Sequence, residues 1–265
     1  MLGSDAMRDK VYFLTDAHLG AGDDSLLREH QLCRFLDTIR GDARMLILLG
    51  DMFDFWFSYR HVVPRGYIRF LGKLAELADD GVELHFFVGN HDMWIFDYLE
   101  QQMNIVMHNE PEFMEIAGRH FLVGHGDGLG HLDRHYDRLR CIFRSRMNQR
   151  LLSMLPEWIT FGIACGWSHR SRLSHGDDVA RYLGDEREGI VIYCREQMLA
   201  VSIDYCVFGH RHTPLAREIV ADNGAKSLYV NVGDWLVHRS YAVFSPSEGL
   251  RLCDWMQTAD NSLSV

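Results

Sequence analysis

Apolar runs and helix-like patterns alternate along the first ninety residues of this 265-residue chain, and this order constrains the fold more than any other feature. Three runs, at 11–15, 45–49 and 84–88, have the continuous apolar character of strands buried on both faces. Between them, 25–39 and 67–78 have the periodicity of amphipathic helices. A β-α-β-α-β order predicts a largely parallel sheet with helices on its faces.

The strand pattern changes in the rest of the chain. Residues 113–116 and 120–123 predict a hairpin around Ala117 and Gly118. Further strand-like runs follow at 205–208, 215–220, 227–232 and 241–244. We expect these later strands to form a second, more antiparallel sheet, so that the whole chain is an α/β protein built as a layered sandwich.

A long, mostly helical stretch at 131–198 interrupts the strands. Its first half is basic and contains Arg134, Arg138, Arg140, Arg144, Arg146 and Arg150. Its centre, 151–167, is apolar. We expect a core made of 1–130 and 199–265, with 131–198 as an insertion that covers the site like a lid. Apolar residues at helical spacing are equally typical of a core between packed helices.

Composition narrows the class of protein. The net charge of -10 argues against broad nucleic-acid binding, but bound cations could still attract an anionic substrate. Six cysteines without a CxxC pair are typical of a reduced, cytoplasmic chain. The opening MLGSDAM lacks a signal-peptide pattern, and no stretch reaches the roughly twenty apolar residues of a membrane-spanning helix.

Side chains that can bind metals follow five predicted strands, at the loops where open α/β sheets place their ligand sites. The five segments are Asp16-Ala-His18, Gly50-Asp51-Met-Phe-Asp54, Gly89-Asn90-His91-Asp92, Gly124-His125-Gly-Asp127 and Gly209-His210-Arg-His212. Each has an ordinary explanation when taken singly, since Asp51 could cap a helix and Gly89-Asn90 is typical of a turn.

The combination of five segments favours a metal site. Carboxylate, amide and imidazole ligands suit Mn²⁺, Fe²⁺ or Zn²⁺ better than a thiolate site would. Two cations about 3.5–4 Å apart, bridged by Asp51 and a hydroxide, form a clamp for in-line displacement at phosphorus and make the nucleophile available near neutral pH.

At these residues the sequence resembles the calcineurin-like metallophosphoesterases, whose motifs D-x-H, G-D-x-x-D, G-N-H-[DE], G-H and G-H-x-H occur here in order over 10–245. The resemblance implies an α-β-β-α sandwich with a helical insertion. It also implies that one cation is held by Asp16, His18, Asp51 and His212, and the other by Asp51, Asn90, His125 and His210.

The same resemblance implies roles around the cations. Asp51 and Asn90 would belong to the catalytic centre together with His91, which would contact the phosphoryl group as a general acid or as a stabiliser of charge. Asp54 and Asp92 would orient imidazole rings through hydrogen bonds.

Within the superfamily the chain is most similar to the UDP-2,3-diacylglucosamine pyrophosphatases of lipid A synthesis. The similarity rests on the insertion and on 125–129, 209–214 and 233–235. It implies Mn²⁺-dependent cleavage of the diphosphate into UMP and 2,3-diacylglucosamine 1-phosphate at the cytoplasmic membrane face. The substrate would contact Asn90, His91, Asp133 and His210.

One residue departs from that narrower pattern. The better-known members have Arg after the metal-binding Asn, whereas this chain has His91, which is the general superfamily residue. A divergent branch of the family is compatible with this difference. So is another phosphoesterase that acts on nucleotides, phosphodiesters or phosphoproteins. A non-catalytic scaffold is the third alternative, although no ligand motif is missing. The sequence leaves the oligomeric state open.

Overall fold

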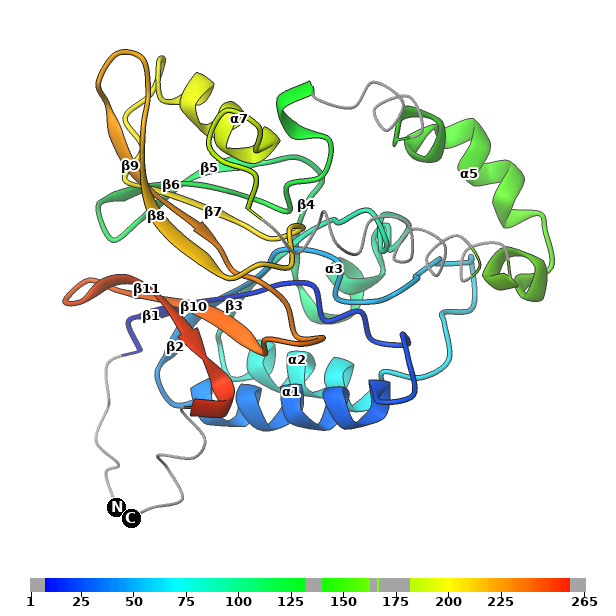
Figure 1. Ribbon diagram of the computed structural model, residues 1–265. Coiled ribbons are helices and arrows are strands. Elements are labelled where there is room, and N and C mark those ends of the chain that lie inside the picture. The colour runs from blue at the N-terminus through cyan, green and yellow to red at the C-terminus, as the bar shows by residue number, and fades with distance from the viewer. Residues whose placement is uncertain (1–7, 132–139, 163–165, 167–181, 258–265) are drawn as a thin grey trace, which may run out of the picture.

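The computed structural model describes residues 8–131, 140–162, 166 and 182–257. Its first sheet has the strand order β11-β10-β1-β2-β3-β4 (Figure 1). Four of these strands run parallel and come from the predicted β-α-β-α-β region and its continuation: β1 (Lys10–Leu14), β2 (Ala43–Leu48), β3 (Glu83–Phe87) and β4 (Val106–His108). Their side chains are mostly buried because both faces of the sheet are covered.

The second sheet has the order β5-β6-β7-β9-β8 and mixes parallel with antiparallel pairs. Its strands are β5 (Glu112–Ile116), β6 (Arg119–Gly124), β7 (Tyr205–Phe208), β8 (Leu215–Val220) and β9 (Lys226–Asn231). Ala117 and Gly118 join β5 to β6 with φ angles of 49° and 75°, as a tight hairpin turn requires. The predicted hairpin is therefore present.

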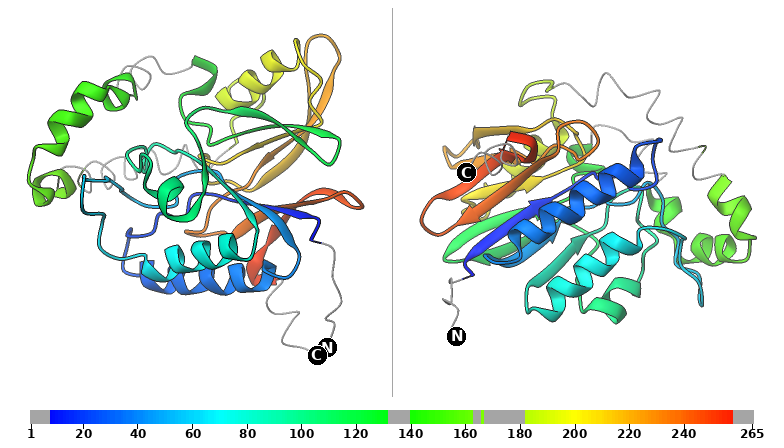
Figure 2. Two further views of the ribbon diagram at one scale, coloured as in Figure 1. Left: turned by 180° about the vertical axis from the view of Figure 1, so that it is seen from behind. Right: turned by 90° about the horizontal axis from the view of Figure 1, so that it is seen from below.

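Helices complete the layers on both outer sides (Figures 1 and 2). The first sheet packs against α1 (Ser25–Ile39), α2 (Ile68–Asp79) and α3 (Tyr98–Met103) through a large buried cluster that includes Phe35 and Leu74. A second cluster, with Phe13 and Phe121, fills the space between the sheets. These layers confirm the predicted α-β-β-α sandwich. The short helix η1 (Leu129–His131) packs beside the second sheet through Leu129, and α5 (Arg146–Ser153) has no buried residue.

The sheet membership of the C-terminal strands differs from the prediction. The strand predicted at 241–244 exists as β10 (Ser240–Ser245), but it pairs antiparallel with β1 in the first sheet. The last strand, β11 (Gly249–Asp254), pairs with β10 and forms the edge of that sheet. The reason is that hydrogen bonds to β1, which is far away in the sequence, decide which sheet receives β10.

The helix α7 (Gly189–Gln197) falls within the predicted insertion, yet it packs as part of the sandwich. Its buried residues Ile190, Val191 and Cys194 join the cluster that covers the outer face of the second sheet. This helix is therefore the outer layer on that side of the sandwich.

Removing a ring between the sheets should destabilise the fold. Phe121 is fully buried and stacks on Phe13 at a centroid distance of 6.1 Å. We expect Phe121→Ala to lower the free energy of unfolding by about 3–5 kcal/mol, as measured by urea denaturation. Phe113→Ala is the matched control, because Phe113 is on the same hairpin and 47% exposed. Equal losses in the two variants would contradict this packing.

Candidate metal centre

The candidate metal centre lies where loops from both sheets meet at the carboxyl ends of their strands (Figure 1). Asp16, Asp51 and Asn90 follow β1, β2 and β3, while His125 and His210 follow β6 and β7. Hydrogen bonds link the loops across the sandwich. The Asp16 carboxylate accepts a bond from the backbone N–H of His210 at 2.9 Å, and His18 N–H donates to the Asp51 carbonyl, also at 2.9 Å.

Strained backbone marks these loops. The left-handed region is disfavoured for residues other than glycine, and such strain gathers at functional sites. Five of the seven predicted metal ligands nevertheless have φ angles between 41° and 66°: Asp16, His18, Asp51, His210 and His212. The hydrogen bonds between loops hold them there, so their side chains are aimed by the fold.

Two glycines let the loops after β2 and β3 approach closely. A Cβ atom on Gly50 would lie 2.7 Å from the backbone nitrogen of Gly89, and one on Gly89 would lie 2.5 Å from the backbone nitrogen of Asp51. Real side chains do not tolerate such distances, so only glycine fits at both positions. The close approach brings Asp51 beside the residues that follow Gly89.

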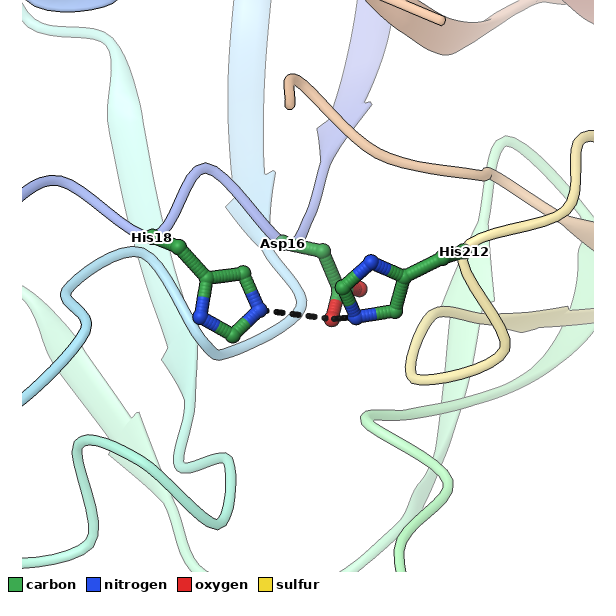
Figure 3. A group of neighbouring side chains, drawn as sticks. All are labelled: Asp16, His18 and His212. Atoms are coloured by element: carbon green, nitrogen blue, oxygen red, sulfur yellow. Dashed lines mark ion pairs between the residues drawn. The ribbon is translucent and has the colours of Figure 1, made fainter. Parts of the chain in front are cut away.

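Three overlapping groups of side chains could each hold a metal ion: Asp16, His18 and His212; His18, Asp51 and His91; and Asp51, His125 and His210. In the first group, the rings of His18 and His212 both turn a nitrogen toward the Asp16 carboxylate (Figure 3). Their Nε2 atoms lie 3.6 Å and 3.1 Å from Asp16 Oδ1.

Asp51 connects the groups. Its Oδ2 lies 3.8 Å from His18 Nε2 and 3.4 Å from His125 Nε2. One carboxylate is thus close to imidazoles from both sheets, which is the position that a ligand shared between two cations needs.

Buried polar atoms without hydrogen bonds show that the groups suit a cation. Within the described part of the chain, Asp16 Oδ1 and both ring nitrogens of His18 are buried and make no hydrogen bond. Each such atom costs about 1–3 kcal/mol unless another partner compensates it. Ligand atoms held about 2 Å from one cation lie about 3–4 Å apart. The observed separations match that spacing.

Other contacts orient the rings. His125 Nδ1 lies 2.7 Å from the carbonyl oxygen of Leu49, so it carries the proton and leaves Nε2 facing Asp51 and Asn90 Oδ1, which is 3.2 Å away. In the same way His91 Nδ1 donates to the Asp54 carbonyl at 3.0 Å. His91 therefore presents its Nε2 to the site.

The two other predicted carboxylates behave differently from one another. Asp54 Oδ1 lies 3.6 Å from His18 Nδ1, which is longer than a hydrogen bond, so its role in orienting that ring stays a prediction. Asp92 instead accepts backbone N–H bonds from Met52 and Gly89, both at 2.9 Å. Asp92 therefore ties the loops after β2 and β3 together through backbone N–H groups.

Asp234 is a site residue that sequence reasoning did not select. Its Oδ2 lies 3.7 Å from His212 Nδ1, and its Oδ1 accepts the backbone N–H groups of Val237 and His238. Its position shortly after β9 could have identified it in the sequence, because the other site residues also follow strands. The predicted substrate residue Asp133 lies outside the described residues.

The charges at the site shift its pKa values strongly. Burial raises the pKa of Asp16 and Asp51, but nearby imidazoles outweigh burial and hold both carboxylates well below their usual range. Burial likewise opposes charge on His18 and His125, yet the carboxylates raise both pKa values to about 10.

The pKa values of two further residues at the site shift in the direction that burial favours. His210 is lowered to a pKa of about 4 by burial and by His125. Asp92 is raised to a pKa of about 7 by burial and by the Asp51 charge.

Buried Asp/His groups that can take divalent cations, on an α-β-β-α sandwich, define a metal-dependent phosphoesterase. The chain belongs to the calcineurin-like phosphoesterase family, because the sequence model of that family matches residues 9–214. It is thus a hydrolase that acts on phosphate bonds.

Named relatives resemble the chain over most of its length. A UDP-2,3-diacylglucosamine hydrolase of Porphyromonas gingivalis is 39% identical and covers 90% of this chain and 95% of its own. Proteins of the same name from Neisseria meningitidis serogroup A and Edwardsiella ictaluri are 29% and 26% identical. These alignments cover 88% and 86% of this chain, and 91% and 85% of the relatives.

Metal binding should release protons. With a pKa of about 10, His18 and His125 are protonated at pH 7.5 in the metal-free protein, whereas coordination needs neutral imidazole. Loading with Mn²⁺ should therefore release protons, and affinity should rise with pH from 6 to 8. Titration calorimetry in buffers of different ionisation enthalpy measures this release. A binding enthalpy independent of the buffer would contradict the protonated state.

Proposed function

We propose that the chain hydrolyses the diphosphate bond of UDP-2,3-diacylglucosamine, adding water and releasing UMP and 2,3-diacylglucosamine 1-phosphate. One observation carries this proposal: a hydrolase named for that substrate is 39% identical over 90% of the chain. The clustering of Asp16, His18, Asp51, His125 and His210 supports it, because a diphosphate needs cations to offset its charge.

Two divalent cations are proposed, and Mn²⁺ is the preferred metal because the ligand atoms are oxygen and nitrogen without thiolate. Asp51 is shared between the sites. One cation is held by Asp16, His18, Asp51 and His212, and the other by Asp51, Asn90, His125 and His210. When bound, the cations would stabilise charge on phosphoryl oxygens and lower the pKa of the attacking water.

His91 is proposed to contact the phosphoryl group. Its Nδ1 is occupied by the Asp54 carbonyl, so Nε2 is the ring nitrogen available to a phosphoryl oxygen or to the leaving group. Its backbone N–H donates to Asp51 Oδ1 at 2.8 Å, which sets the ring close to the shared carboxylate. Asn90 and His210 would contact the same phosphoryl group, and Asp133 the sugar.

The lipid portion of this substrate suits the exposed helix α5 of the proposed lid. None of the residues of α5 is buried. Met147 within the helix is 68% exposed, and Met154 and Trp158, which follow it, are 79% and 73% exposed. With Arg146 and Arg150, this is the composition of helices that lie at membrane interfaces. We infer that the enzyme works at the cytoplasmic face of the membrane.

No helix in the described ranges has both the length and the apolar character needed to span a bilayer.

A different phosphoester is the alternative substrate. His91, in place of the Arg of the better-known lipid A enzymes, favours it. A lid with polar side chains would favour it too, but the exposed side chains around α5 are largely apolar. The acylated substrate is therefore preferred, and a purely structural role is disfavoured by the complete set of ligand motifs.

The substrate proposal is tested by UMP release in the presence of Mn²⁺. We expect kcat/KM for UDP-2,3-diacylglucosamine to exceed that for UDP-N-acetylglucosamine about 100-fold or more. Each methylene group that an acyl chain buries contributes about 0.8 kcal/mol, so a few suffice for this ratio. Equal values for the two compounds, or hydrolysis of simple phosphodiesters only, would refute the substrate.

The shared ligand is tested separately by Asp51→Ala. We expect metal content to fall from two ions toward zero. Turnover should fall about 1,000-fold or more, because the lost charge stabilisation amounts to several kcal/mol. Elemental analysis and UMP release measure the two effects. Asp222→Ala is the control, since Asp222 is exposed and pairs with Arg195. Full activity in Asp51→Ala would exclude a shared carboxylate.

A further inference from the structure

The connection between β2 and α2, together with the first turn of α2, presents an unusual mixture of apolar and basic side chains to solvent. Val62 is 54% exposed and Ile68 is 75% exposed. Arg60, Arg65 and Arg69 are exposed beside them. We call residues 60–69 the arginine segment. An exposed branched apolar residue is ordinary when it is single, but here two stand among three cationic residues.

The backbone of the arginine segment is anchored, so these side chains are held outward. Pro64 is buried, and Val63 and Tyr67 pack against the core of the first sheet. The Tyr67 ring lies 5.0 Å from that of Phe53 and 6.2 Å from that of Trp56, measured between centroids. The exposed residues therefore belong to a fixed surface.

The charge of the arginine segment opposes that of the whole chain. The protein has a net charge of -10, yet residues 55–75 contain three Arg and one Lys and no Asp or Glu. Among the described residues, the side chains of Arg60, Arg65 and Arg69 form no ion pair, whereas Lys73 pairs with Asp37 and Glu76. The described part of the chain thus leaves these three guanidinium groups open to an anionic partner.

The arginine segment and α5 lie at the same end of the molecule in every view (Figures 1 and 2). Contacts link their surroundings. The Phe55 ring lies 4.9 Å from that of Phe161, which follows α5, and Ser58 N–H donates to the carbonyl of Trp94 at 2.9 Å. The metal-centre loop at Asp51 leads directly into this region. The arginine segment therefore follows the metal-centre loop directly in the chain and shares one end of the molecule with α5.

We propose that the arginine segment and α5 together form one docking surface for an anionic lipid bilayer. The arginines bind lipid phosphates, while Val62, Ile68 and the apolar side chains of α5 enter the interfacial layer. Contacts at both the arginine segment and α5 would fix the orientation of the enzyme on the bilayer. The choice of a bilayer as the partner rests on the proposed function, because that substrate is a lipid.

Vesicle binding tests the docking surface without any substrate. The full chain is sedimented with large vesicles of phosphatidylglycerol and phosphatidylethanolamine, and in parallel with vesicles of phosphatidylcholine alone. The wild type should prefer the anionic vesicles. The variant R60Q/R65Q/R69Q should bind them between about tenfold and 100-fold more weakly, given the contribution of each basic residue near an anionic surface. Val62→Ser combined with Ile68→Ser should weaken binding without a change of charge.

The matched control is R44Q/R119Q/R251Q, which removes the same charge from exposed arginines set back from that end of the molecule. It should bind the anionic vesicles nearly as well as the wild type. Equal losses in the two triple variants would reduce the effect to net charge and overturn the proposal. The proposal would also be overturned if the wild type bound anionic vesicles no better than phosphatidylcholine vesicles, or if it bound an acidic protein and no vesicles.

UMP release from detergent-dispersed substrate is measured alongside for all variants. It should be unchanged in R60Q/R65Q/R69Q, because dispersed substrate needs no docking. If the variant loses vesicle binding but still releases UMP, the docking surface is supported and the proposed function is unaffected. If the wild type releases no UMP, the proposed function fails, whatever the vesicle result. A parallel loss of both would place the arginines in the catalytic site and overturn the docking role.

Discussion

Carboxylates buried at the ends of the central strands set the conditions for the rest of the structure. Asp16, Asp51 and Asp92 are at most 1% exposed, and a carboxylate removed from water must be compensated by donors or cations. Asp16 accepts the N–H of His210, Asp51 that of His91, and Asp92 those of Gly89 and Met52. Most of these bonds join different loops, so compensating the charge also fixes how the strand ends meet.

The same compensation prepares the site for cations. In the metal-free chain, imidazoles balance the carboxylates electrostatically, but Asp16 Oδ1 and the His18 ring nitrogens gain no hydrogen bonds in the described structure. The left-handed backbone at Asp16, His18 and His212 is held against its preference so that these atoms converge. The fold therefore accepts local strain and unsatisfied polar atoms where a divalent ion can offset both.

Family and substrate rest on different parts of the molecule. The metal-centre loops define a calcineurin-like phosphoesterase, and they say little about what is attached to the phosphate. The residues around them are more specific: His91 beside Asp51, the exposed α5 with its mixture of basic and apolar side chains, and the arginine segment at 60–69. A lipid diphosphate would meet His91 with its head group and α5 with its chains, while the bilayer that carries it would meet the arginine segment.

Local pattern alone determined much of this protein. It predicted helix α1 over 25–39, the parallel strands and the residues at their ends, because burial and turn chemistry leave periodic signals. Tertiary structure decided which sheet receives β10, that α7 covers the second sheet, and that Asp234 lies beside His212. It also turned Asp92 toward backbone N–H groups. Those outcomes depend on contacts between residues far apart in the chain, and no local pattern encodes which partner a strand, a helix or a carboxylate will meet.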